Sequence, residues 1–70
     1  MSEHVVVTRA DGLLTLRINR PEKKNALTRA MYSQLGEALR QADADPHINA
    51  VLITGSSECF TAGNDIADFL

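Results

Sequence analysis

The chain has 70 residues, of which 44% are hydrophobic and 23% charged, and its formal net charge at pH 7 is −2. This composition is that of an ordinary globular protein rather than a disordered segment, and the weak negative charge gives no sign of nucleic-acid binding. No apolar run approaches the roughly 20 residues that cross a bilayer. We therefore expect no nucleic acid and no membrane among its partners.

Cysteine and histidine usage sets further limits. The single Cys59 excludes an intrachain disulfide, and two histidines do not make a ligand cluster, so we expect no metal site. Met1 to His4 lacks the basic start and the long apolar core of a secretory signal, so a cytoplasmic location is the default expectation. A chain of this length forms one small domain at most, and it buries a modest fraction of its surface.

The first predicted element is a β-hairpin. Val5 to Arg9 is rich in β-branched residues and predicts a strand, and Asp11-Gly12 after it is the commonest signal for a tight turn. Leu13 to Asn19 then alternates between apolar and polar residues. This period predicts a half-buried strand that pairs with the first one in the antiparallel direction.

A loop and a helix follow. Pro21 cannot donate to a strand ladder, so Arg20 to Asn25 predicts a loop. Thr28 is the expected N-cap of the helix, and Asp45-Pro46 is expected to end it. The apolar stripe predicted to face the core contains Met31, Leu35, Ala38, Leu39 and Ala42.

The next element is an apolar run, Ala50 to Thr54, which predicts a strand covered on both faces because it shows no alternation. A strand, a helix and a second strand in this order favour a parallel pair of strands. We interpret Phe60, beside this strand, as a core residue rather than a pocket residue. Ligands of α/β sheets tend to bind at the carboxyl ends of such strands, and this strand leads into Phe60 to Ile66.

The segment from Phe60 to Ile66 precedes a predicted short helix, and its chemistry suggests a binding role. A helix start presents unpaired backbone N–H groups, which suit a substrate oxygen that becomes negative during a reaction. Gly63 has no side chain to keep a substrate off the backbone. Our hypothesis is a loop that polarises a carbonyl, with the Asn64 amide as the best donor. The alternative is an ordinary helix entry in which Asn64 or Asp65 caps and Gly63 turns.

Three motifs in order carry a resemblance: Asn19-Arg20-Pro21, Asn25-Ala26-Leu27 and Phe60-Thr61-Ala62-Gly63-Asn64-Asp65-Ile66. Together they resemble the N-terminal part of the crotonase superfamily, the enoyl-CoA hydratases and isomerases. The resemblance implies an α/β fold, the N-terminal part of a crotonase-like ββα spiral. It also implies that residues 1–70 are the truncated N-terminal segment of a single acyl-CoA-binding domain.

The same resemblance implies how a thioester would be bound. Members of the superfamily hold the thioester oxygen between two backbone amides, and the resemblance places the first of these at Asn64. The second amide and the usual glutamate acid and base belong to segments beyond residue 70. The residues that would contact the substrate or its CoA part are Lys24, Ala26, Leu27, Ala62, Gly63, Asn64, Asp65 and Ile66.

Two of these residues have competing interpretations. Lys24 lies where the resemblance puts the nucleotide half of CoA and would meet a phosphate as a point charge, but a lysine in a turn is often only solvated. Asp65 stands beside the expected amide donor, but an acid in the first turn of a helix usually complements the helix dipole. We therefore interpret Asp65 as structural rather than as a catalytic base.

The function implied by the resemblance is hydration or isomerisation of an acyl-CoA thioester, in which an enolate is stabilised in an oxyanion hole. No cofactor is expected apart from the CoA that the substrate carries, and a complete member would be a trimer or a hexamer. The alternative is a non-catalytic CoA-binding or subunit-interacting fragment. A third possibility, a nucleotide-binding unit, is disfavoured because the chain contains no phosphate-binding glycine motif.

Overall fold

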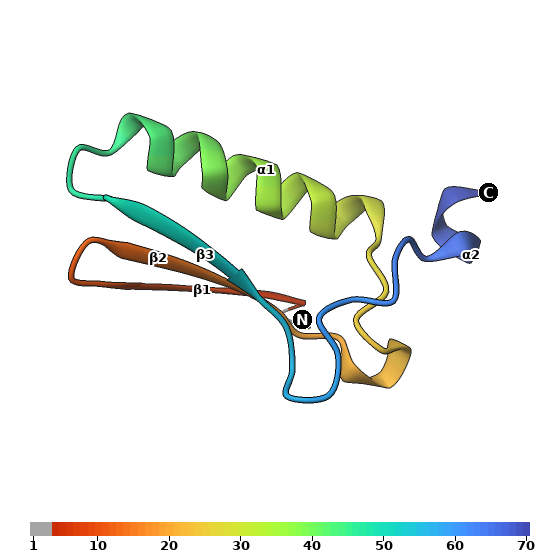
Figure 1. Ribbon diagram of the computed structural model, residues 1–70. Helices are drawn as coiled ribbons and strands as arrows, with labels where there is room; N and C mark the ends of the chain where they lie inside the picture. The colour runs from red at the N-terminus through yellow and green to blue at the C-terminus, as the bar shows by residue number, and fades with distance from the viewer. Residues whose placement is uncertain (1–3) are drawn as a thin grey trace.

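The computed structural model describes residues 4–70 (Figure 1). Met1 to Glu3, which entered the expectation about a secretory signal, lie outside the described residues. Over the described part of the chain, no helix has the length and apolar character needed to cross a membrane. The elements in order are β1 (Val5–Ala10), β2 (Leu13–Ile18), the 3-10 turn η1 (Pro21–Lys23), α1 (Arg29–Ala44), β3 (Ala50–Thr54) and α2 (Ile66–Phe69).

The predicted hairpin is confirmed. β1 and β2 pair in the antiparallel direction, from Val5 opposite Ile18 to Ala10 opposite Leu13. The two turn residues have positive φ angles, 52° at Asp11 and 81° at Gly12, as the tight turn favoured in hairpins requires. The alternation in β2 also holds, since its buried side chains are Leu14, Leu16 and Ile18.

Helix α1 begins and ends where the sequence predicts. The Thr28 side chain accepts a hydrogen bond from the Met31 N–H at 3.2 Å, and the helix stops at Ala44 before Pro46. The helix lies along one face of the sheet (Figure 1). A Cβ placed at Gly36 would meet nothing within 4 Å, so close packing does not require a glycine at this position of the helix.

The core lies between α1 and the hairpin, in two clusters. One cluster combines Met31 of α1 with buried residues from both strands and from the following loop: Val5, Ile18 and Leu27. The other combines the second half of α1 with β2: Ala38, Ala42, Leu14 and Leu16. Leu35 is half-buried and packs on both clusters. The predicted stripe is wrong at Leu39, which is 41% exposed because it lies beside the hairpin-facing surface of the helix rather than on it.

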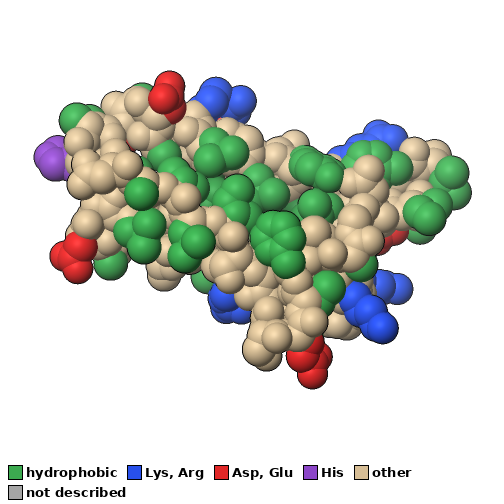
Figure 2. All heavy atoms as spheres, in the orientation of Figure 1, with side chains coloured by type: hydrophobic (Ala, Val, Ile, Leu, Met, Phe, Trp, Pro, Cys, Tyr) green, Lys and Arg blue, Asp and Glu red, His purple; other side chains and the backbone are tan. Residues whose placement is uncertain are grey.

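Strand β3 pairs with β2 in the parallel direction, as predicted, from Leu13 opposite Ala50 to Arg17 opposite Thr54. The expectation that β3 is covered on both faces is wrong for residues 4–70, because Leu52 is 49% exposed. β3 is one of the two edge strands in the order β1-β2-β3, and α1 packs on β1 and β2. Hydrophobic side chains therefore show at the middle of the surface formed by α1 and β3 (Figure 2).

Phe60 is likewise not a core residue, since 55% of it is exposed. It follows the turn after β3, where Ser56 accepts the Cys59 N–H at 3.0 Å through its hydroxyl. This turn projects past the end of the sheet (Figure 1). None of the described residues covers the aromatic ring enough to bury it.

Candidate functional site

Two motifs that are far apart in the sequence lie side by side in the structure. The Ala62 N–H donates to the Lys24 carbonyl at 3.1 Å, and the Thr61 hydroxyl donates to the Asn25 carbonyl at 2.6 Å. These bonds attach the segment after β3 to the loop that precedes α1. Hydrogen bonds to the backbone carbonyls of this loop therefore bring together the residues predicted to form one site.

The attachment continues as a parallel β-bridge between Leu27 and Asn64. The Leu27 N–H donates to the Gly63 carbonyl at 2.8 Å, and the Leu27 carbonyl accepts the Asp65 N–H at 2.8 Å. In this arrangement the bridged residue opposite Leu27 turns its own N–H and C=O to the other side. Accordingly, the Asn64 N–H has no acceptor among residues 4–70, whereas the N–H groups of Gly63 and Asp65 are both used.

Asp65 is the N-cap of α2, which confirms its structural interpretation. Its side chain accepts the Asp68 N–H at 3.3 Å, and its other carboxylate oxygen accepts a 2.7 Å hydrogen bond from Arg20. The Asn64 amide lies one residue before this cap, and α2 has only four residues. The expectation that a helix start presents the donor is therefore wrong in detail, because the Leu27 bridge and not the helix leaves this amide free.

The predicted binding residues differ in how they present their side chains. Leu27 is 8% exposed and packs in the core, so only its backbone faces the neighbouring segment. Ala26 is half-buried, Lys24 and Ala62 are exposed, and Ile66 is 73% exposed. A CoA molecule could thus reach Ile66 and Lys24 by side chain. Direct contacts of these residues with CoA remain predictions.

A hollow of about 230 Å³ lies between η1 and the turn after β3. Lys24 is the only predicted CoA ligand that lines it, together with Pro21, Asn25 and residues 56–59. The Lys24 backbone has a positive φ of 51° and ends η1. Lys24 is therefore part of a concave surface. Asn64 is not among the residues that line this hollow.

The first turns of α1 hold α2 and the side chain of Asn64, which sequence reasoning missed. The Tyr32 hydroxyl donates to the Asn64 side-chain oxygen at 2.6 Å, and its ring packs edge-on against Phe69 with centroids 6.1 Å apart. The Arg29 N–H donates to an Asp68 carboxylate oxygen at 2.7 Å. The only signal in the sequence was the position of Tyr32 one turn after the N-cap, beside the apolar stripe.

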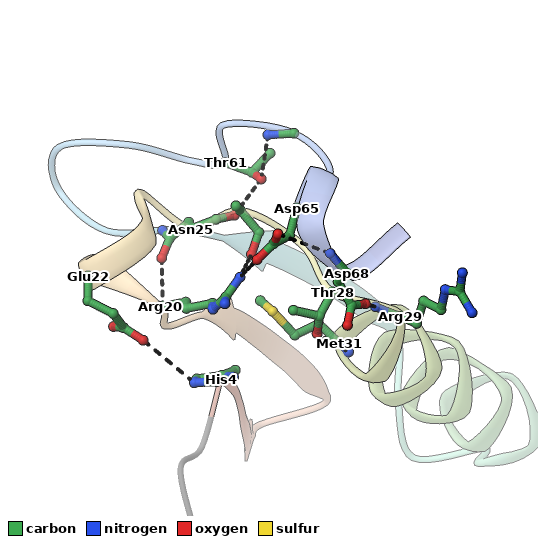
Figure 3. A network of polar contacts seen from close by, with 12 residues as sticks. His4, Arg20, Glu22, Asn25, Thr28, Arg29, Met31, Thr61, Asp65 and Asp68 are labelled. Atoms are coloured by element: carbon green, nitrogen blue, oxygen red, sulfur yellow. Dashed lines mark hydrogen bonds and ion pairs between the residues drawn. The ribbon is translucent and has the colours of Figure 1, made fainter. Parts of the chain in front are cut away.

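Sequence reasoning also missed the roles of Arg20 and Asn25, which Figure 3 shows between the two segments. Both belong to the motifs that carried the resemblance, but neither was given a role. Asn25 is buried and has a positive φ of 59°, a conformation that asparagine adopts more readily than most residues. An asparagine two residues after η1 was the available signal.

The Arg20–Asp65 ion pair predicts a pH-dependent stability. The hydrogen bond from Arg20 holds the pKa of the Asp65 carboxyl below its ordinary value, although burial opposes this. A lowered folded-state pKa stabilises the fold above the unfolded pKa, about 3.9, and this stabilisation is lost as pH falls through the folded pKa. We therefore expect Asp65→Asn to flatten the acid side of the stability curve, measured by urea unfolding between about pH 5 and pH 2.

Asp45 supplies the matched comparison, because the pKa of its carboxyl is also lowered, first by the backbone N–H of His47. Asp45 lies after the C-terminal end of α1, at the opposite end of the molecule from α2. The effects of Asp45→Asn and Asp65→Asn should therefore add. If stability falls as steeply with decreasing pH in Asp65→Asn as in the wild type, the Arg20–Asp65 pair is not the source of this pH dependence.

Comparisons with known proteins place these features in context. The family described as Enoyl-CoA hydratase/isomerase matches residues 8–70. Human Enoyl-CoA delta isomerase 2 is 42% identical over 67 residues, which are 96% of this chain and 17% of that protein. The 1,2-epoxyphenylacetyl-CoA isomerase of Escherichia coli K12 is 38% identical over 68 residues, 97% of this chain and 26% of that protein.

The fold also has similar counterparts among solved structures. Pseudomonas aeruginosa OdaA superposes with a TM-score of 0.93 at 62% identity, over 97% of this chain and 28% of that one. This similarity confirms the expected α/β fold class, with its hairpin, crossover helix and parallel strand. The chain spans less than a third of the length of any of these three proteins.

Proposed function

The chain belongs to the enoyl-CoA hydratase/isomerase family of the crotonase superfamily, and from this premise we propose that it supplies half of an oxyanion hole. The family acts on acyl-CoA thioesters. The proposed reaction is hydration of an enoyl thioester or a shift of its double bond. Both reactions pass through an enolate-like state, in which negative charge develops on the thioester oxygen.

The observation that carries the proposal is the Asn64 N–H, which has no acceptor among residues 4–70. Its neighbours Gly63 and Asp65 both form backbone hydrogen bonds with Leu27, while the Asn64 N–H points away from Leu27. A fixed amide stabilises a developing oxyanion more than a neutral carbonyl, because no reorientation is needed as the charge forms. We assign Asn64 the role of the first donor.

We further propose that CoA lies across the two attached segments. Lys24 would meet a phosphate, and Ile66 and Ala62 would contact the pantetheine or the adenine. The exposure of all three residues supports this placement. In a complete family member, the second donor and the acid and base would come from other segments than these two. In the cell we propose a cytoplasmic location and, for a complete protein, a trimer or hexamer.

The uncovered surface of β3 favours a second candidate, a fragment that binds another subunit without catalysis. Leu52 and Val51 are 49% and 38% exposed on an edge strand, and a stable chain usually covers such a strand. A fragment of this kind would associate with a partner or with itself. CoA need not affect that association.

Crotonyl-CoA provides the test, applied to the purified 70-residue chain. If the site is half formed, the thioester should raise the apparent stability, by about 2.7 kcal/mol when its concentration is 100 times its Kd. Thermal unfolding would measure this, with crotonate lacking CoA as the control ligand. We expect no efficient hydration of crotonyl-CoA. The ultraviolet absorbance of the enoyl thioester would measure this reaction.

Three other results would change the assignment. Rapid turnover by the chain would show that the acid, the base and both donors lie within it, against the half-site proposal. Self-association on sizing with no effect of crotonyl-CoA would favour the subunit-interacting fragment. Equal stabilisation by crotonate would show that CoA is not recognised.

A further inference from the structure

A buried asparagine, Asn25, hydrogen-bonds the segment after β3 that carries the Asn64 amide. Asn25 is 1% exposed and is the buried polar residue of the described chain. Its side-chain oxygen accepts the Arg20 N–H at 2.7 Å. Its side-chain nitrogen donates to the Cys59 carbonyl at 3.0 Å and to the Phe60 carbonyl at 3.2 Å. One amide group thus spans two consecutive peptide units of the segment after β3.

A second link runs through the backbone of the same residue. The Asn25 carbonyl accepts the Thr61 hydroxyl, and that hydroxyl in turn accepts the Gly63 N–H at 3.1 Å. The chain of bonds therefore reaches from Asn25 to the residue directly before Asn64. Buried polar groups of this kind rigidify the backbone when all their hydrogen bonds are made.

Arg20 forms an ion pair with the residue that follows Asn64. Its side chain is 13% exposed, and one terminal nitrogen donates both to an Asp65 carboxylate oxygen at 2.7 Å and to the Ala26 carbonyl at 3.1 Å. Asp65 directly follows Asn64. Arg20 and Asn25 are themselves joined by two hydrogen bonds, from the Arg20 N–H to the side-chain oxygen and from the Asn25 N–H to the Arg20 carbonyl.

We propose that Asn25 and Arg20 are positioning residues that fix the direction of the Asn64 N–H, an inference that rests on the proposed function of that amide. Asn25 hydrogen-bonds the backbone before Asn64. Arg20 hydrogen-bonds Asp65, the residue after Asn64 (Figure 3). The bridge between Leu27 and Asn64 lies between these two sets of contacts. Neither side chain is required to touch the substrate in this role.

The test compares two ligands on the 70-residue chain, crotonyl-CoA and the but-2-enyl thioether of CoA, which lacks the carbonyl. A hydrogen bond from Asn64 to the carbonyl should make the thioester bind about 2- to 12-fold more tightly than the thioether. In ¹H–¹⁵N spectra, the Asn64 amide proton should move downfield with the thioester only. This shift reports the direction of the donor, which overall stability does not.

The first variant is Asn25→Gly, which keeps the positive φ available and removes the side-chain amide. We expect it to bind the thioether as the wild type does and to lose the preference for the thioester, together with the Asn64 shift. Arg20→Lys keeps the charge but loses the forked guanidinium, and it should lower the preference by a smaller factor. Arg9→Lys is the matched control, because Arg9 pairs with Asp45 away from both segments.

The outcomes separate this inference from the function on which it rests. A wild-type chain that binds both ligands equally would remove the proposed donor role of Asn64, and the positioning role with it. A wild-type preference that persists in folded Asn25→Gly would overturn the positioning role alone. Should Asn25→Gly be unfolded, Arg20→Lys decides: a folded Arg20→Lys with the full wild-type preference overturns the proposal, and a reduced preference that Arg9→Lys does not share supports it.

Discussion

Met31→Ala is expected to unfold a large fraction of the chain. Met31 is completely buried between the hairpin and α1, in contact with the cluster that contains Leu27. Truncating a buried methionine to alanine costs about 2–5 kcal/mol, because the cavity adds to the lost burial. Small proteins have only about 0.05–0.15 kcal/mol of stability per residue, so a loss of this size is comparable to the total for 70 residues.

Urea unfolding followed by circular dichroism would measure the effect of Met31→Ala. Met31→Leu is the control for volume and should cost less than about 1.5 kcal/mol. Ser33→Ala, on the exposed side of α1, is the control for helix substitution. Because Leu27 packs on Met31 and also forms the bridge to Asn64, Met31→Ala should weaken crotonyl-CoA binding as well. An unfolding midpoint equal to that of Met31→Leu would show that the cluster does not hold the fold together.

The hairpin and α1 could be predicted because each carries its own local signal. Asp11-Gly12 adopts the positive φ angles that a two-residue turn needs, and Thr28 caps the helix through its hydroxyl. Pro46 prevents the helix from continuing. These effects act within a few residues, so they require no information about the rest of the chain.

The exposure of β3 could not be predicted in the same way. An unbroken apolar run indicates that a strand tolerates burial on both faces, but it does not say which elements cover it. In the structure α1 covers the hairpin, and the side chains of Val51, Leu52 and Leu39 remain partly exposed. The same dependence on distant neighbours explains the wrong expectation for Phe60.

The candidate site was predicted only in part, because its construction is non-local. Motif order pointed to the residues near Lys24 and Asn64, and the structure brings these two segments together. The Arg20–Asp65 pair joins residues 45 positions apart, and no periodicity relates them. Asn25 resembles an ordinary turn asparagine in sequence, since asparagine is common in turns for its own local reasons. Only the fold reveals that its side chain is buried.

Replacing the Asn64 backbone N–H by an ester oxygen is expected to abolish the preference for a thioester over a thioether. Residues 59–70 can be attached as a synthetic peptide through Cys59, a free thiol, so the asparagine side chain is retained. The amide donates to no acceptor among residues 4–70, so the fold loses no hydrogen bond from it. The Gly63 carbonyl becomes a weaker acceptor for the Leu27 N–H, and a small loss of stability should result.

An ester at Asp65 is the matched control for the ester at Asn64. The Asp65 N–H donates to the Leu27 carbonyl at 2.8 Å, so its removal should cost about 0.5–1.5 kcal/mol of stability. The thioester preference should nevertheless survive in this control. Calorimetric titration of both ligands would measure the preference in each chain. If the chain with the ester at Asn64 keeps the thioester preference and the chain with the ester at Asp65 loses it, the N–H that donates to the carbonyl belongs to Asp65 and not to Asn64.

The largest consequence of the Asn64 ester concerns catalysis rather than binding. A hydrogen bond to a neutral thioester carbonyl contributes about 0.5–1.5 kcal/mol, whereas an oxyanion-hole donor typically lowers a barrier by about 3–4 kcal/mol. The difference arises because the enolate oxygen carries charge that the carbonyl does not. An anionic enolate analogue linked to CoA should therefore lose more affinity from the ester than crotonyl-CoA does. Equal losses for the two ligands would mean that Asn64 binds the substrate without favouring the charged state.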